Sequence, residues 1–143
     1  MKLYFDTAYI AKCYLNEPGG SQVRSLAGRA AGLYSSSWCV AEMACVIHRN
    51  FREGTLDASE ADAIRSYFRE DIGSGIWVLL PVTERVLLAA EQFTAKLSAS
   101  VYIRAGDLVH LITAVEAGFT EIWTNDRHLA SAAEHTGLSP RTL

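Results

Sequence analysis

Short apolar runs alternate with longer helix-like segments along the 143 residues, and this alternation restricts the fold more than any other feature. We expect strands at residues 3–5, 33–35, 76–81 and 121–124, the second being the weakest signal. The runs are mostly apolar throughout rather than at every second position, which is typical of strands covered on both faces. The pattern therefore predicts an α/β fold, a three-layer α/β/α sandwich with a small central, mostly parallel sheet.

Helix signals fill the segments between these runs, and residues 1–143 are expected to form a single domain. Predicted helices cover residues 8–15, 22–31, 38–52, 57–72, a segment opened by Thr83, 107–117 and 127–135, and residues 138–143 are a candidate edge strand. Thr7 is the expected cap of the first helix. The residues expected to face inward are Val40, Ala44, Ile47, Phe51, Ala61, Ile64, Phe68, Val86, Leu87, Ala90 and Phe93.

Composition excludes several classes of protein. Half of the residues are apolar and a fifth are charged, which is a globular balance. No apolar run is long enough to span a membrane, and an acid at position 6 interrupts the N-terminus too early for a secretory signal. We therefore expect a cytoplasmic protein. Its cysteines, Cys13, Cys39 and Cys45, form no C-x-x-C pair and are expected to be small buried hydrophobes.

Four carboxylates occupy positions that suit a shared site. Asp6 ends the first predicted strand and Asp126 follows the fourth closely. Ligands of open parallel sheets bind beyond the carboxyl ends of the strands, so these two acids can share one cleft. Glu42 lies in a strongly apolar helical segment, and Asp107 opens a helix on the same side as Leu111.

Each of these acids also has a simpler interpretation. Asp6, Asp107 and Asp126 can be helix caps, and Glu42 can be an exposed glutamate on a second helix face. The conjunction is more informative, because four acids in one small fold repel each other unless cations bind. Oxygen ligands of this kind suit Mg²⁺ or Mn²⁺, which can activate water against a phosphate.

The chain offers no better set of catalytic groups. Ser35 to Ser37 lack a G-x-S-x-G context, and the histidines show no H-E-x-x-H spacing. His110, although close to Asp107, is expected to be a core or helix-surface histidine. Tyr9, Tyr14, Trp38 and Phe51 can stack on bases, but the core is the favoured location for them.

These residues carry a resemblance to a known family. The chain resembles the PIN-domain nucleases, and among them the VapC-type toxins of bacterial toxin–antitoxin pairs. The matching segments are Leu3-Tyr4-Phe5-Asp6-Thr7, Glu42 early in a helix, Gly106-Asp107 with the helix through Ala114, and Trp123-Thr124-Asn125-Asp126.

The resemblance implies an endoribonuclease that depends on Mg²⁺ or Mn²⁺, forms a homodimer and has a small antitoxin partner in its cleft. It assigns Asp6, Glu42, Asp107 and Asp126 to the acidic metal site, with Thr124 as a supporting hydroxyl and Asn125 as a second supporting residue. The position of Thr7 suggests that it orients Asp6.

Two other functions stay open, and so does DNA in place of RNA as the substrate. The fold can serve as a catalytically silent binding module, although a scaffold has no need to gather like charges. It can also be an aspartyl-phosphate phosphotransfer or phosphatase domain, but position 8 is alanine and no lysine follows Lys96. The formal charge of −3 provides no general attraction for nucleic acid, so contact with RNA has to come from metal and local arginines. Candidates for such a rim, which can equally be solvated, are Arg24, Arg29, Arg49, Arg52, Arg65, Arg69 and Arg104.

Overall fold

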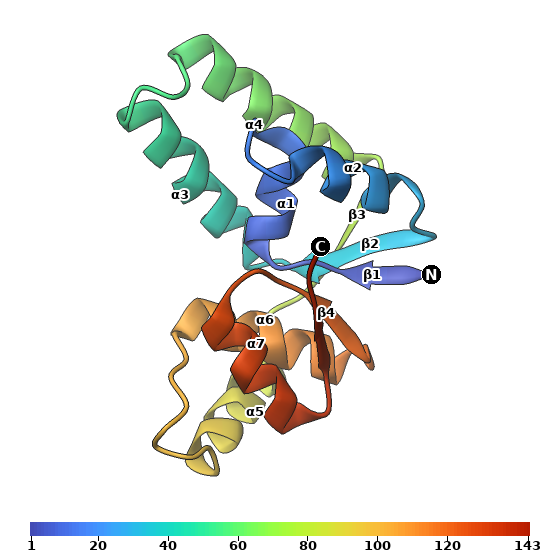
Figure 1. Cartoon of the computed structure of the whole chain (residues 1–143), viewed down its shortest axis with the longest axis vertical. Coiled ribbons are helices and arrows are strands. Elements are labelled where there is room, and N and C mark those ends of the chain that lie inside the picture. The colour runs from blue at the N-terminus through green and yellow to red at the C-terminus, as the bar shows by residue number, and fades with distance from the viewer.

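Five short parallel strands form the centre of the molecule in the computed structural model, which describes residues 1–143 (Figure 1). They are β1 (Lys2–Tyr4), β2 (Gly32–Ser36), β3 (Trp77–Leu80), β4 (Glu121–Trp123) and β5 (Ser139–Arg141). β2 pairs with both β1 and β3, and β4 pairs with β5, always in parallel. A parallel bridge between Phe5 and Trp123 joins the two groups, so the strand order is β3-β2-β1-β4-β5. The predicted parallel sheet is confirmed.

Helices cover both faces of this sheet. One layer holds α1 (Thr7–Tyr14), α2 (Gly20–Gly28), α3 (Cys39–Arg52) and α4 (Ala58–Gly73), and the other holds α5 (Glu84–Ala95), α6 (Ala105–Glu116) and α7 (Arg127–Ala133) (Figure 1). A 3₁₀ turn over Glu134–Thr136 follows α7. Along β1, Leu3 and Phe5 pack into the first layer and Tyr4 into the second. Burial on both faces explains why the strand sequences are apolar throughout.

The two layers have separate apolar cores. The first joins β1 and β2 to the inner sides of α1 to α4, and the second joins Tyr4 to α6, α7 and β4. Ala61 and Phe68 of α4 are buried in the first core and Ile64 is half-buried, as predicted. A capping box between Asp57 and Glu60 begins α4 at the predicted place.

The predicted inner face of α3 is wrong except at Ile47, whereas that of α5 is correct except at Leu87. In α3 the buried stripe is Cys39, Met43 and Ile47, whereas Val40, Ala44 and Phe51 are exposed. The predicted stripe is rotated by about one residue, roughly 100°, because apolar residues occur on two sides of this helix. In α5, Leu87 is exposed while Val86 and Ala90 are buried and Phe93 is half-buried.

Helix starts and cysteines also need correction. The cap of α1 is Asp6 rather than Thr7, and α6 begins at Ala105, two residues before Asp107. Of the cysteines, only Cys39 is buried, and Cys45 is exposed. None of the helices combines the length and the apolar character that crossing a bilayer requires.

The C-terminal residues return to the helix that follows β1. The predicted edge strand exists as β5, and beyond it the Leu143 N–H donates to the Tyr9 hydroxyl at 3.0 Å. The Tyr9 hydroxyl also reaches Thr142 and Asn125. These contacts tie the last residues to the first turn of α1.

Candidate active site

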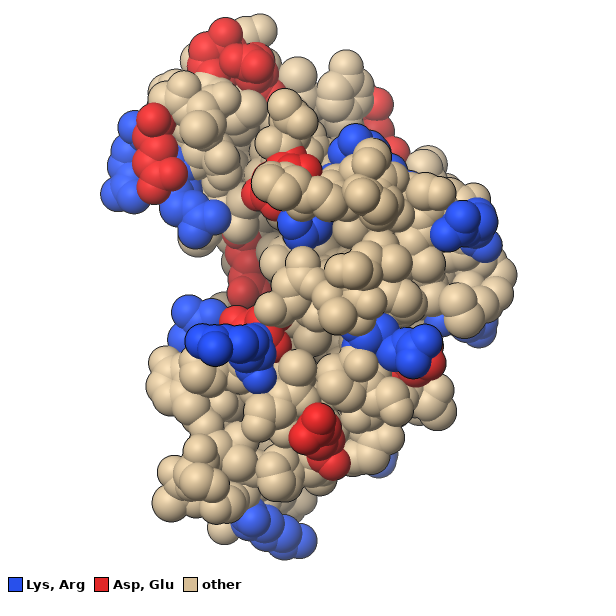
Figure 2. Space-filling model, viewed as in Figure 1, with Lys and Arg blue, Asp and Glu red and all other residues tan.

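A cavity of about 680 Å³ opens at the carboxyl edge of the sheet, and all four predicted acids line it. Asp6 follows β1, Asp126 follows β4, Glu42 projects from α3 and Asp107 from α6. The four acids therefore come from four different segments and both helical layers. Figure 2 shows acidic side chains inside a hollow between the layers, with basic side chains on both sides.

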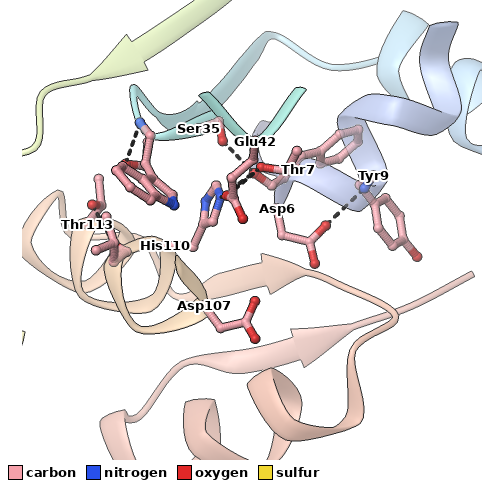
Figure 3. A network of polar contacts seen from close by, with 12 residues as sticks. Asp6, Thr7, Tyr9, Ser35, Glu42, Asp107, His110 and Thr113 are labelled. Carbon is pink, nitrogen blue, oxygen red and sulfur yellow. Dashed lines mark hydrogen bonds and ion pairs between the residues drawn. The ribbon is translucent and has the colours of Figure 1, made fainter. Parts of the chain in front are cut away.

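Asp6 is the most deeply placed of these acids, with only 5% of its surface exposed. Its Oδ1 caps α1 by accepting from the Tyr9 N–H at 2.9 Å (Figure 3). Burial raises the pKa of Asp6 from 3.8 to about 6, against the opposing effects of the Thr124 hydroxyl, the Tyr9 N–H and the charge of His110. No arginine or lysine forms an ion pair with it. Asp6 is thus a buried acid without a cationic partner in contact, which is costly when ionised.

Two side chains hold Glu42 in place, and one of them, His110, was not among the predicted site residues. Its Oε1 accepts from the Thr7 hydroxyl at 2.8 Å and lies 2.6 Å from His110 Nε2. The Nδ1 of His110 lies 3.3 Å from the Tyr4 hydroxyl, and the imidazole is almost fully buried. Burial acts to raise the pKa of Glu42, but His110, Thr7 and Arg104 outweigh it and the pKa is lowered. Glu42 is therefore kept ionised and fixed in direction.

Arg104 links the two remaining acids. Its Nε lies 3.4 Å from Asp107 Oδ2, and its Nη2 lies 3.4 Å from Asp126 Oδ2. The other oxygen of Asp126 caps α7, accepting from the His128 and Leu129 N–H groups. Burial raises the pKa of Asp107, as does the charge of Asp126, and Arg104 only partly opposes this. The caps proposed for Asp6 and Asp126 are thus real, but each uses only one carboxylate oxygen.

The three residues predicted to support the acidic site, Thr7, Thr124 and Asn125, lie in different places. The Thr124 hydroxyl is buried, accepts from the Asp126 N–H at 2.9 Å and lowers the pKa of Asp6. Thr7 lines the cavity but bonds to Glu42 and His110, not to Asp6 as expected. Asn125 is exposed, and its Oδ1 accepts from Tyr9 and Thr142, outside the residues that line the cavity.

Three further residues shape the cavity. Trp38, expected in the core, is 41% exposed and lines the cavity with Glu42. Gly106 faces both, since a Cβ there would lie 3.0 Å from Glu42 Oε2 and 3.1 Å from Trp38 Nε1. His110 follows Asp107 by three residues, and this helical spacing is the sequence signal that could have placed it at the site.

The donor chemistry of the cavity suits a hard divalent cation, because its acidic ligands are all carboxylates. In this structure no group of three or more His, Cys, Asp or Glu side chains is close enough to hold a metal ion. Arg104 supplies positive charge between Asp107 and Asp126 instead. Asp6 and Asp107 both line the cavity, and Figure 3 shows their carboxylates near one another in the layer between the sheet and α6. The carboxylates therefore fit a hard cation by their chemistry, while the guanidinium of Arg104 lies beside two of them.

The fold and the cavity define an α/β domain with an acidic site at the carboxyl edge of a parallel sheet. The PIN-domain family model matches residues 3–135, and the chain belongs to this family. PIN domains are generally nucleases. No curated protein sequence shows a significant match to the chain.

Solved structures with the same fold cover almost the whole chain. FitAcB from Neisseria gonorrhoeae has a TM-score of 0.72 at 19% identity, covering 98% of this chain and 96% of that one. FitAB bound to an IR36 DNA fragment has a TM-score of 0.71 at 18% identity, with 99% and 94% covered. VapBC2 from Rickettsia felis, bound to a promoter DNA fragment, has a TM-score of 0.69 at 13% identity, with 99% and 98% covered.

Proposed function

We propose that this protein is an endoribonuclease that depends on Mg²⁺ or Mn²⁺ and acts as the toxin of a toxin–antitoxin pair. The observation that carries the proposal is that Asp6, Glu42, Asp107 and Asp126 line one cavity while Asp6 is buried without a cationic partner. A cluster of this kind is unfavourable for the free protein, which is expected of a site built to bind cations.

The four carboxylates would hold the ions. A bound Mg²⁺ or Mn²⁺ would activate a water molecule for attack on the phosphodiester and stabilise the charge that builds on the phosphate. Thr7 and His110 hold Glu42 in its ionised form and fix its orientation. Asp6 and Asp126 each keep one oxygen on helix N–H groups, which fixes the direction of the other oxygen. Hydrolysis adds water across the P–O bond and leaves two shorter strands.

The test is cleavage of single-stranded RNA with Mn²⁺, with Mg²⁺ and with EDTA. Asp6→Asn and Asp126→Asn should each reduce the rate by at least about a hundredfold, as loss of a key electrostatic group does. Asp62→Asn, which changes an exposed acid of α4, is the matched control and should leave the rate unchanged. Equal rates in all four proteins, or cleavage that survives EDTA, would overturn the proposal. A DNA strand of the same sequence reports the preference for the 2′-hydroxyl.

Two partners complete the proposal. The likeness to FitAB and VapBC2, which are toxin–antitoxin complexes, supports a small antitoxin that occupies the cleft, and we propose that the protein acts in the cytoplasm. We also propose a homodimer, supported by exposed apolar residues such as Val40 of α3 and Leu87 and Leu88 of α5. Light scattering during size-exclusion chromatography measures the mass of the assembly, and a monomer at all concentrations would contradict the dimer.

A further inference from the structure

Helix α3 presents two different faces to the molecule. Cys39, Met43 and Ile47 face the first apolar core. A second side lines the cavity, where Trp38 just before α3 and Glu42, Cys45 and Arg49 of α3 form a stripe beside Ala41 and Val46. The spacing of four, three and four residues places this stripe along one side of the helix. An aromatic ring, the acid Glu42 and a cation therefore follow one another along a single wall of the acidic cavity.

Trp38 is unusual among the three tryptophans of the chain. Trp77 and Trp123 are 3% and 7% exposed, whereas Trp38 is 41% exposed. The indole Nε1 lies beside Gly106 at the start of α6, and the backbone N–H of Trp38 donates to Ser36 Oγ at 3.2 Å. A partly exposed indole on the wall of a cavity that also holds four acids offers a flat apolar surface to a partner with a flat apolar face of its own.

Arg49 lies at the other end of this wall. It is exposed, lines the cavity and takes part in none of the salt bridges of the chain. Seven residues separate it from Glu42, which corresponds to about 10 Å along the helix axis. It thus provides an uncompensated positive charge beyond the acids, where a continuing nucleic-acid backbone would carry its next negative charges.

We propose that the Trp38 indole stacks on one unpaired base of the RNA beside the reacting phosphate, and that Arg49 contacts a backbone phosphate farther along the same strand. The proposal rests on the proposed nuclease function and adds a subsite to it. A base stacked on Trp38 has to leave any duplex, so the segment bound in the cavity is unpaired. Stacking on an aromatic side chain accepts any base, so Trp38 positions the strand without reading its sequence.

Tryptophan fluorescence tests this subsite directly, because Trp38 is the exposed tryptophan. The probe is a short single-stranded RNA of mixed sequence, added with Mn²⁺ to the Asp6→Asn protein so that the strand stays intact. Binding should quench the emission, and a Trp38→Phe version of the same protein should bind the RNA without this quenching. A DNA strand of the same sequence should quench similarly, because the indole contacts the base and not the sugar.

Kinetics in the otherwise wild-type protein separate stacking from a structural role. Trp38→Ala should raise KM about tenfold, Trp38→Phe should restore most of the affinity, and kcat should change little. Phe51→Ala, which removes another exposed aromatic from α3 outside the cavity, is the matched control and should leave KM unchanged. Arg49→Gln should weaken binding and lower the slope of log affinity against log salt by about 0.7.

Abasic substitutions along the RNA identify the stacked nucleotide. At one position the missing base should weaken binding to wild-type protein as much as Trp38→Ala does, and the two changes together should cost no more than either alone. If the wild type cleaves RNA but Trp38→Ala alters neither KM nor the abasic profile, the subsite is refuted and the nuclease function stands. If the wild type neither binds nor cleaves RNA, both proposals are refuted.

Discussion

The four carboxylates of the cavity have three different sets of polar partners. Glu42 has a histidine and a hydroxyl, Asp107 and Asp126 share the guanidinium of Arg104, and Asp6 has only a backbone N–H and a hydroxyl as polar partners. A divalent ion that binds Asp126 needs the Oδ2 atom that Arg104 approaches, because Oδ1 caps α7, and Arg104 also lies beside Asp107 Oδ2. The arginine and the metal therefore compete.

Replacement of Arg104 by glutamine should strengthen metal binding. Without the guanidinium, the ion no longer has to displace a positive charge, and the affinity for Mn²⁺ should rise about fivefold. Titration calorimetry on protein without RNA measures this change. Arg85→Gln, which breaks the exposed salt bridge to Glu116, is the control and should leave the affinity unchanged. A weaker or equal affinity in Arg104→Gln would show that Arg104 does not occupy the cation position.

Replacement of Gly106 by alanine should lower the activity while leaving the stability almost unchanged. Alanine is favoured over glycine inside a helix by about 1 kcal/mol, but here its Cβ would meet Glu42 and Trp38 at 3.0 and 3.1 Å. We expect Gly106→Ala to unfold at a temperature close to the wild type while its cleavage rate falls about tenfold, because a small displacement of Glu42 impairs the site. Thermal unfolding and initial rates measure the two effects. Gly73→Ala, where nothing lies within 4 Å of the new methyl, should leave the rate unchanged.

At the scale of elements, the junction of α1, α4 and β3 depends on two consecutive hydrogen bonds between side chains. The Trp77 indole N–H donates to the Tyr14 hydroxyl at 2.7 Å, and this hydroxyl donates to Asp71. Burial raises the pKa of Tyr14, and so does its hydrogen bond to Asp71. The tyrosine therefore stays protonated and can satisfy both neighbours.

Tyr14→Phe should destabilise the fold without changing the chemistry. The change leaves the buried Trp77 N–H without its acceptor, which costs about 1 to 3 kcal/mol. Urea unfolding followed by circular dichroism measures the loss. The cleavage rate of the folded fraction should match the wild type, since Tyr14 does not line the cavity. A change in rate with unchanged stability would contradict this division of roles.

The sequence predicts the strands and their ends better than the faces of the helices. Strands such as residues 3–5 are bounded on both sides, so the acids that follow them are placed within a residue or two. Apolar residues on two sides of α3 leave its orientation ambiguous, because one side contacts the core and the other lines the cavity. An aromatic residue at position 38 suits either the core or the wall of the cavity, and only tertiary packing decides between these two locations. Arg104 was a candidate for the rim, but its position between Asp107 and Asp126 depends on the approach of α6 to α7.

At the scale of the whole molecule, the buried Asp6 makes stability depend on pH. Its pKa is about 6 in the folded protein against 3.8 for an ordinary aspartate. The folded state therefore binds a proton more tightly than the unfolded state between these values. The stabilisation of the folded state by proton binding to Asp6 is fully present below about pH 4. It is lost as the pH rises through about 6, which lowers the free energy of unfolding by about 3 kcal/mol.

Asp6→Asn should remove this loss. At about pH 7.5 the variant should unfold at higher urea concentration than the wild type, while at about pH 4 the two should be similar. Mn²⁺ should stabilise the wild type more than the variant, because the ion neutralises the buried carboxylate. Parallel urea titrations with and without Mn²⁺ at both pH values measure these effects. A variant that is less stable than the wild type at neutral pH would mean that the Asp6 charge is compensated.

The contact between the end of the chain and Tyr9 has a practical consequence for handling the protein. Leu143 and Thr142 form hydrogen bonds with the Tyr9 hydroxyl. The backbone N–H of Tyr9 in turn donates to the Asp6 carboxylate. A purification tag fused after Leu143 would crowd this junction and disturb the aspartate indirectly. Met1 is 71% exposed and precedes β1 at the opposite edge of the sheet, so a tag attached there is the safer choice for enzymatic work.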